Sequence, residues 1–399
     1  MEIISRNRYE SLITNRLHRG EVVVLSGHRR AGKSMILEAM AKKLSTQGNV
    51  IYMDMEDPDN CGVKTFVELN EVIKGKFLKG GRNFVLIDEV QEIAEFEKAL
   101  RFWTKQPQTD IIVTGSNAYL LSSEISTLFA GRNNTVHIYS LDYNEYLNFN
   151  KLKDCEESLT SYLRWGGLPF LHILPMEDTR SRIDYLGSIY NTVFVKDIVT
   201  KKMVRNATML DNLVRFLAEN CGKTFSANSI AKYLKGSDTK SSVNTINDYL
   251  ECLCDAYMID KVRRYDIKGK RVFEQQEKYY FQDIGIRNYL CADKRNLDIE
   301  KVMENVVYLK LKQLGYDVYV GALNGKEVDF VAKIGDDVRY LQVTMRIAGD
   351  DTYQREYGNL KLIKDNYPKY VITLDPLAEM VKDEGIITLS LRSFLRDGI

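Results

Sequence analysis

Residues 22–39, VVVLSGHRRAGKSMILEA, constrain the fold more than any other part of the chain. Four apolar residues predict a short buried strand, and apolar residues at helical spacing begin again at Met35. Between them lies the motif G-x-x-x-x-G-K-S, which runs from Gly27 to Ser34. A strand, this motif and a helix in this order predict a phosphate-binding loop.

The chemistry of this loop follows from its residue types. Glycines let the backbone turn its N–H groups toward an anion, and the N-terminus of the next helix adds a positive dipole end. We expect Lys33 to face the β- and γ-phosphates and Ser34 to be a ligand of Mg²⁺. The alternative is a glycine-rich turn that happens to carry a lysine, which the flanking strand and helix disfavour. The predicted phosphate-binding residues are Gly27, His28, Arg29, Arg30, Ala31, Gly32, Lys33 and Ser34.

A second motif, the acidic pair Asp88-Glu89, follows the apolar run 84–87. Asp88 would hold Mg²⁺ together with Ser34, and Glu89 would polarise the attacking water as a general base. The alternative is a buried strand that simply ends in charged residues. The phosphate-binding loop upstream favours the catalytic interpretation.

A third polar group follows the predicted strand 110–114. Ser116 and Asn117 are candidates to sense the γ-phosphate or to orient water, although Gly-Ser-Asn is equally a plain turn. Strands and helices alternate, which predicts an α/β fold with a parallel sheet, helices on both faces and the ligand at the carboxyl ends of the strands. The other predicted elements are strands at 49–55 and 135–139 and helices at 63–78 and 94–106.

Composition excludes several classes of protein. A net charge of +1 over 399 residues argues against a chain that binds nucleic acid through its overall charge. The six cysteines are scattered and the four histidines join no cysteine cluster, so we expect reduced thiols and no zinc site. We also expect a cytoplasmic location and no membrane partner, because no apolar run approaches about 18 residues.

Five segments carry a resemblance: GHRRAGKS, VLIDEVQ, VTGSNAYLL, LFAGR and YSLDYNEYL. They are similar to a family of predicted bacterial and archaeal AAA-type ATPases that carry a C-terminal domain of unknown function. The resemblance implies ATP rather than GTP as the nucleotide. It also matches Gly131 and Arg132 to a Gly-Arg pair of the family. Arg132 would act as an arginine finger in cis or in a neighbouring subunit of a homo-oligomer, or it is a solvated surface residue.

Residues 146–205 predict a helical lid, and residues 206–290 predict three helices followed by a hairpin. This order is the plan of a winged helix, whose recognition helix would begin at Lys240 and Ser241. Basic residues on the hairpin would neutralise DNA phosphates, or the domain packs against a protein instead. The candidate hairpin residues are Arg263, Arg264, Lys268, Lys270 and Arg271.

Residues 291–399 predict a helix, three strands, a helix over 350–366 and a final strand. This order resembles the restriction-endonuclease-like PD-(D/E)xK fold. Glu304 and Asp329 match two of its acidic positions, but Gln342 and Thr344 stand where that fold carries Glu-x-Lys. Gln342 is a weak ligand for a hard cation and Thr344 is uncharged, so we expect an inactive site.

The chain therefore predicts four parts: an ATPase core at 1–145, a lid at 146–205, a winged-helix-like domain at 206–290 and a nuclease-like domain at 291–399. The first functional hypothesis is an ATPase that uses Mg²⁺ and ATP and whose appended domains act on DNA. The second is a nucleotide-gated switch that hydrolyses ATP slowly and binds a protein partner. The third is an ATP-regulated DNA nuclease.

Overall fold

The computed structural model describes residues 4–60, 62–115, 133–200, 204, 206–234, 242–292, 298–346, 350–375, 383 and 385–399. The chain divides into two compact units. Unit 1 comprises Met1–Ser140 with Asp255–Tyr257, and unit 2 comprises Leu141–Cys254 and Met258–Ile399. In the described part of the chain, every helix is too short or too polar to span a bilayer.

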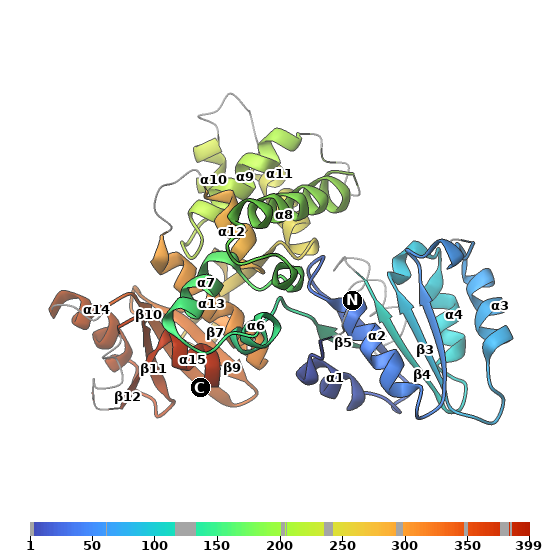
Figure 1. Cartoon of the computed structure of the whole chain (residues 1–399). Coiled ribbons are helices and arrows are strands. Elements are labelled where there is room, and N and C mark those ends of the chain that lie inside the picture. The colour runs from blue at the N-terminus through green and yellow to red at the C-terminus, as the bar shows by residue number, and fades with distance from the viewer. Residues whose placement is uncertain are drawn as a thin grey trace. The chain divides into compact units, whose positions relative to one another are not determined.

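Unit 1 is built on a parallel sheet (Figure 1). Its described strands lie in the order β2-β3-β4-β1-β5, and every neighbouring pair is parallel. The elements are α1 (Asn7–Thr14), β1 (Val22–Ser26), α2 (Lys33–Leu44), β2 (Asn49–Asp54), η1 (Pro58–Asn60), α3 (Phe66–Lys76), β3 (Asn83–Asp88), η2 (Val90–Glu92), α4 (Phe96–Trp103), β4 (Thr109–Thr114) and β5 (Asn133–His137).

Two apolar cores cover the two faces of this sheet. Leu69 of α3 and Leu100 of α4 pack with alternate strand residues such as Val24 on one face. Ile13 of α1 and Leu37 of α2 pack on the other. Strands β1, β3 and β4 are buried along their whole length, as expected for a parallel sheet covered on both sides. The predicted α/β sheet with helices on both faces is confirmed.

Several boundaries in unit 1 differ from the sequence prediction, and helix α4, for example, covers 96–103 rather than 94–106. Strand β5 begins at Asn133 rather than Thr135, because its polar first residues pair with β1 from Val22↔Asn133 onward. Helix α3 covers 66–76 rather than 63–78, because Thr65 and Glu68 form a reciprocal capping box that sets its start. Helix α1 was not predicted.

Unit 2 contains a mixed sheet (Figure 1). Its described strands lie in the order β12-β11-β10-β9-β8-β6-β7. Strands β8, β9 and β10 form an antiparallel meander, and β10, β11 and β12 are parallel. The elements are α6 (Tyr143–Asn150), α7 (Glu156–Trp165), η3 (Pro169–Ile173), α8 (Thr179–Thr192), η4 (Val193–Thr200), α9 (Ala207–Glu219), α10 (Ala227–Leu234), α11 (Val243–Asp255), β6 (Ile259–Asp266), β7 (Arg271–Phe281), α12 (Ile284–Leu290), α13 (Ile299–Leu314), β8 (Asp317–Leu323), β9 (Lys326–Ile334), β10 (Asp337–Thr344), α14 (Asp350–Lys361), β11 (Lys369–Thr373), β12 (Ile386–Ser390) and α15 (Leu391–Asp397).

The hairpin β6–β7 extends the C-terminal sheet. Helices α9, α10 and α11 and both hairpin strands are present where the sequence predicts them. However, β6 also pairs in parallel with β8, for example Tyr265↔Gly321. Apart from Asp255–Tyr257, the structure therefore groups residues 146–205, 206–290 and 291–399 into one unit, whereas the sequence divides them into three parts. The pairing of β6 with β8 joins strands that are separated by β7 and two helices, so no local sequence pattern predicts it.

The segment 164–169, RWGGLP, contains the end of α7, a turn and the start of η3, and it is hydrogen-bonded to residues of α12 and its N-cap. The carboxylate of Asp283 accepts hydrogen bonds from the N–H groups of Gly167, at 3.0 Å, and Ile286, at 3.2 Å. Asn288 donates to the Leu163 carbonyl at 2.8 Å. Gly166 has φ +75°, and a Cβ there would lie 2.5 Å from the Gly285 nitrogen. The turn thus joins the helices after residue 141 to the rest of unit 2.

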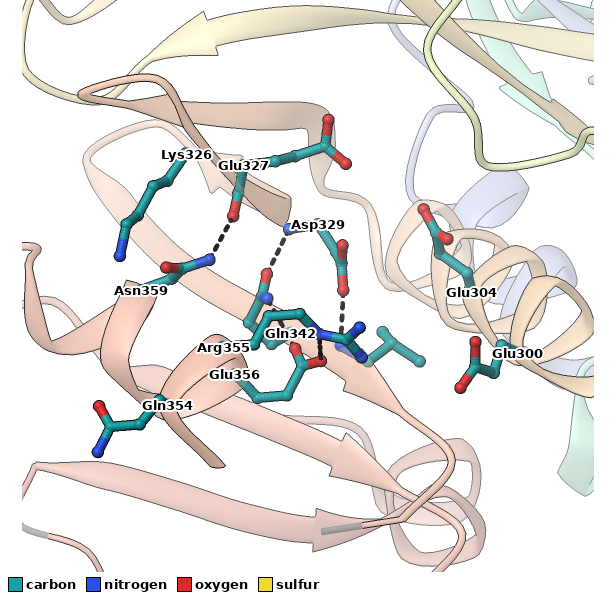
Figure 2. A pocket seen from close by; sticks show the side chains of 11 residues that line it. Glu300, Glu304, Lys326, Glu327, Asp329, Gln342, Gln354, Arg355, Glu356 and Asn359 are labelled. Carbon is teal, nitrogen blue, oxygen red and sulfur yellow. Dashed lines mark hydrogen bonds and ion pairs between the residues drawn. The ribbon is translucent and has the colours of Figure 1, made fainter. Parts of the chain in front are cut away.

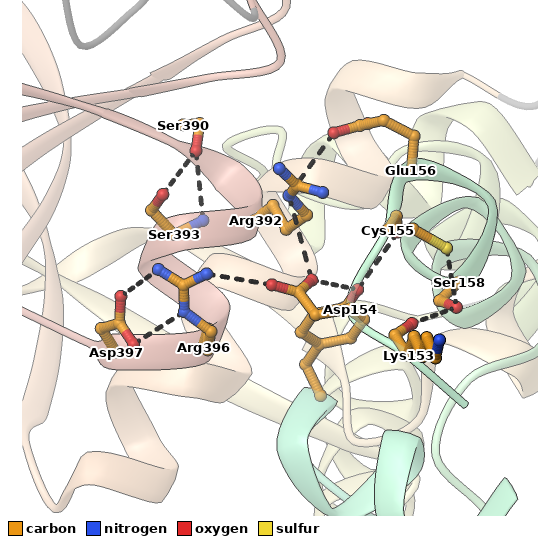
Figure 3. A network of polar contacts seen from close by, with 11 residues as sticks. Lys153, Asp154, Cys155, Glu156, Ser158, Ser390, Arg392, Ser393, Arg396 and Asp397 are labelled. Atoms are coloured by element: carbon orange, nitrogen blue, oxygen red, sulfur yellow. Dashed lines mark hydrogen bonds and ion pairs between the residues drawn. The ribbon is translucent and has the colours of Figure 1, made fainter. Parts of the chain in front are cut away.

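The C-terminal helix α15 is fastened by ion pairs, which Figure 3 shows. Arg396 contacts Asp154 at 3.0 Å, and Arg392 contacts Glu156 at 3.5 Å. Tyr143 also donates to Asp154, at 2.9 Å. Strand β12 and helix α15 were not predicted.

Helix α14 ends at Lys361 instead of residue 366. The chain turns after it, because the Asp365 carboxylate accepts the N–H of Tyr367 at 3.2 Å and Pro368 follows.

Candidate functional site

The predicted phosphate-binding loop connects β1 to α2 in the structure. Gly27 has φ +138°, and a Cβ there would lie 2.2 Å from the carbonyl oxygen of Ile138. Gly32 has φ +98° and immediately precedes α2. Both positions therefore require glycine, and they bring the loop onto the N-terminus of the helix.

Lys33 is buried within the loop. Its ammonium donates hydrogen bonds to the carbonyl oxygens of Gly27, at 2.9 Å, and His28, at 3.0 Å. His28 and Ala31 are also buried, Arg29 and Gly32 are half-buried, and Arg30 and Ser34 are exposed. The positive charge of Lys33 therefore lies inside the predicted phosphate-binding loop.

Asp88 lies at the carboxyl end of β3 and is buried. Burial raises the pKa of Asp88, while hydrogen bonds from the Thr114 and Ser34 hydroxyls lower it. Because β1, β4 and β3 are adjacent and parallel, the loop and the carboxylate meet at the same edge of the sheet. A carboxylate beside a hydroxyl is an oxygen donor set that fits Mg²⁺.

Glu89 follows Asp88 in a left-handed backbone conformation, with φ +52° and ψ +52°. Its N–H donates to the Thr114 hydroxyl at 2.9 Å, and its carboxylate accepts a hydrogen bond from the Gln91 amide. This conformation is uncommon outside glycine and is held here by neighbouring bonds. Thr114 therefore contacts both residues of the acidic pair.

Arg6 is a residue of this region that sequence reasoning missed. Its guanidinium is buried and donates to the carbonyl oxygens of Ala31 in the loop, at 2.9 Å, and Tyr139 after β5, at 3.0 Å. No motif marks Arg6, because its contacts lie 25 and 133 residues away along the chain.

Several predicted residues lie outside the described part of the chain. They are Ser116, Asn117, Arg132, Lys240 and Ser241.

The predicted basic residues of the hairpin lie on β6, β7 and the turn between them. Lys268, Lys270 and Arg271 are exposed at this turn, and Arg263 is exposed on β6. Arg264 is half-buried and donates to Gln276 on the partner strand, so it is less available than its neighbours.

Glu304, Asp329 and Gln342 line one pocket of about 580 Å³ in unit 2, as Figure 2 shows. Glu300, Glu327 and Glu356 add further carboxylates to it. Thr344 does not line this pocket. It is buried, and its hydroxyl donates to the Arg346 carbonyl at 3.3 Å. The structure thus gathers three of the four predicted positions and separates the fourth.

Hydrogen bonds and an ion pair link several polar groups of this pocket. Gln342 accepts the N–H of Asp329 at 2.6 Å and donates to Glu356 at 2.8 Å. Asp329 accepts the N–H of Val343 at 2.8 Å, and Arg355 contacts Glu356 at 2.7 Å. Within the described ranges, no set of three or more acidic, histidine or cysteine side chains is placed to hold a metal ion.

The fold and the loop define a P-loop nucleotide-binding protein of the AAA type. A family described as "AAA domain" matches residues 19–147, and a family described as a domain of unknown function matches residues 156–300. An uncharacterized protein of Haemophilus influenzae is 31% identical over 380 residues, which cover 93% of each chain. The chain belongs to the same family as this relative, and its residues 19–147 match the AAA domain.

Two further comparisons extend this result. An uncharacterized protein of Methanocaldococcus jannaschii is 28% identical and is aligned over 93% of this chain and 85% of its own. The solved structure of a Walker-type ATPase of Pyrococcus abyssi aligns with a TM-score of 0.54 at 18% identity. That alignment covers 72% of this chain and 96% of the other, and it supports the fold.

Proposed function

We propose that the protein is an ATPase that uses Mg²⁺ and ATP and that unit 1 carries its catalytic site. The observation that carries this proposal is the contact of Ser34 and Thr114 with Asp88 beside the loop that holds Lys33. Phosphate binding, cation binding and water activation would then use three neighbouring strand ends.

Each residue has a separate task in this proposal. The loop N–H groups and Lys33 would bind the phosphates, and Ser34 and Asp88 would hold Mg²⁺, which would supply positive charge next to them. Glu89 takes a proton from the attacking water, for which the Gln91 amide has to release its carboxylate. ATP as the nucleotide, and Arg132 as an arginine finger in a homo-oligomer, follow from the family resemblance.

Two variants test this assignment. Lys33→Ala should abolish tight ATP binding, because it removes the charge that faces the phosphates. Glu89→Gln should bind Mg²⁺ and ATP like wild type and lose most turnover, because an amide does not accept the proton. Calorimetry measures the binding and phosphate release measures the turnover. Unchanged ATP affinity in Lys33→Ala would show that this loop is not the site.

The second functional candidate, a nucleotide-gated switch with a protein partner, uses the same site with slow hydrolysis. A turnover measurement with and without duplex DNA separates the two. Stimulation that falls with salt favours action on DNA, and a slow rate that DNA leaves unchanged favours the switch.

We propose that residues 206–290 act as a winged-helix-like module whose hairpin contacts the DNA backbone. The exposed Lys268, Lys270 and Arg271 at the hairpin turn support this. We propose that residues 291–399 are an inactive nuclease-like domain, since Gln342 is committed to Asp329 and Glu356. DNA cleavage in Mg²⁺ or Mn²⁺ that is lost in Asp329→Ala would revive the third hypothesis, a nuclease.

A further inference from the structure

A lysine from the hairpin forms ion pairs with two carboxylates that line the acidic pocket of unit 2. Lys278 lies on β7, and only 2% of its side chain is exposed. Its ammonium is 2.8 Å from a carboxylate oxygen of Glu304 on α13 and 2.8 Å from one of Glu327 on β9. One buried cation therefore joins β7, α13 and β9.

The charge balance keeps this lysine protonated. Burial by itself lowers the pKa of Lys278, but the carboxylates of Glu304, Asp329 and Glu327 outweigh burial and raise the pKa above its ordinary value. Burial also raises the pKa of Asp329, and the neighbouring Glu304 adds to the rise while Lys278 opposes it. The charge states of Lys278 and Asp329 thus depend on their charged neighbours.

The carboxylates around Lys278 already have internal partners. Glu304 also accepts a hydrogen bond from the Tyr280 hydroxyl at 2.5 Å, and Glu327 accepts one from Thr224 at 3.2 Å. Asp329 accepts the N–H of Val343 at 2.8 Å. These partly buried carboxylates and their partners surround the buried ammonium of Lys278, which needs them because an isolated buried charge is costly.

We propose that the ammonium of Lys278 is the cation held by Glu304 and Glu327 beside this pocket and takes the place that a divalent metal would otherwise occupy. The pocket then binds no divalent ion in the wild-type protein. Its carboxylates serve to fasten the hairpin β6–β7 to α13 and β9. This role of Lys278 in attaching the hairpin does not depend on ATP hydrolysis by unit 1.

Binding of Mn²⁺ to the nucleotide-free full chain tests the proposal, with free Mn²⁺ measured by electron paramagnetic resonance. Wild type and Asp329→Asn should bind Mn²⁺ equally, because the pocket contributes no site. A Mn²⁺ ion that wild type binds and Asp329→Asn loses would overturn the proposal without any change to Lys278.

The second arm removes the ammonium. Lys278→Met leaves the carboxylates without their cation, so its Tm in NaCl should fall by about 5 °C or more. Millimolar Mn²⁺ should restore part of this loss, and Mn²⁺ affinity should rise at least tenfold over wild type.

Lys310→Met is the matched control for this arm. Lys310 is also a buried lysine, and it pairs with the single carboxylate of Asp142 at 3.4 Å. Its removal should lower Tm without any gain in Mn²⁺ binding. If Mn²⁺ stabilises Lys278→Met no more than it stabilises Lys310→Met, Lys278 does not stand in for a metal.

Discussion

The Thr114 hydroxyl makes a sharp test of the catalytic edge of unit 1. It is fully buried, it donates to the Asp88 carboxylate, and it accepts the N–H of Glu89 at 2.9 Å. Thr114→Val replaces this hydroxyl with a methyl group of similar size. The variant cannot form either hydrogen bond, while the packing of β4 is retained.

The cost follows from the two bonds. A hydrogen bond to a charged group contributes about 1.5–3 kcal/mol and one between neutral groups about 1 kcal/mol. We therefore expect the free energy of unfolding of unit 1 to fall by about 2.5–4 kcal/mol. Thr114→Ser keeps the hydroxyl and should lose only about 1 kcal/mol for the missing methyl group.

The two tryptophans allow unit 1 to be followed by itself. Trp103 lies in the core of unit 1 and Trp165 lies in unit 2, so a Trp165→Phe background leaves a single reporter. Urea denaturation of the Val and Ser variants in this background then reports unit 1. With an m-value of about 2–3 kcal/mol/M, the midpoint of Thr114→Val should fall by about 1 M or more.

Activity gives a second measurement of the same change. The Thr114 hydrogen bond lowers the pKa of Asp88, so its removal should raise that pKa further. Since Mg²⁺ binding needs the ionised carboxylate, the acid limb of ATP turnover should move to higher pH in Thr114→Val. A raised pKa in the folded state also means that ionisation of Asp88 costs stability as pH rises through that pKa. If Thr114→Val matches Thr114→Ser in urea and in its pH profile, the hydroxyl does not organise this edge.

Two further predictions concern the phosphate-binding loop and the hairpin. Arg6→Met should weaken ATP binding about tenfold, because the guanidinium no longer bonds to the Ala31 carbonyl of the loop. The value of kcat at saturating ATP should change less, and Arg6→Lys should restore part of the affinity. Equal Kd values for Arg6→Met and wild type would refute this prediction. Replacing Lys268, Lys270 and Arg271 by Ala should weaken binding to any duplex and reduce the salt slope by about 0.9 for each phosphate that the hairpin no longer neutralises. Fluorescence anisotropy at several salt concentrations measures the slope, and a slope equal to that of wild type would exclude the hairpin as a DNA-binding element.

Features carried by contiguous residues could be predicted from the sequence. The loop from Gly27 to Ser34 is set by glycines, a flanking strand and a helix, all within one short segment. Asp88 and Glu89 are likewise marked by the apolar strand before them. Their meeting at one sheet edge follows from the parallel arrangement that alternating strands and helices impose.

Features that depend on distant partners came only from the tertiary structure. Arg6 reaches Ala31 and Tyr139, and β6 pairs with β8, without any motif that announces either contact. Lys278 belongs to a hairpin that its local sequence marks as basic and exposed, yet its ammonium is buried between Glu304 and Glu327. Local patterns determine which element forms and which face is apolar, because they act through backbone geometry and burial. Which charges meet is decided by the folding of remote segments onto one another, and that information is spread over the whole chain.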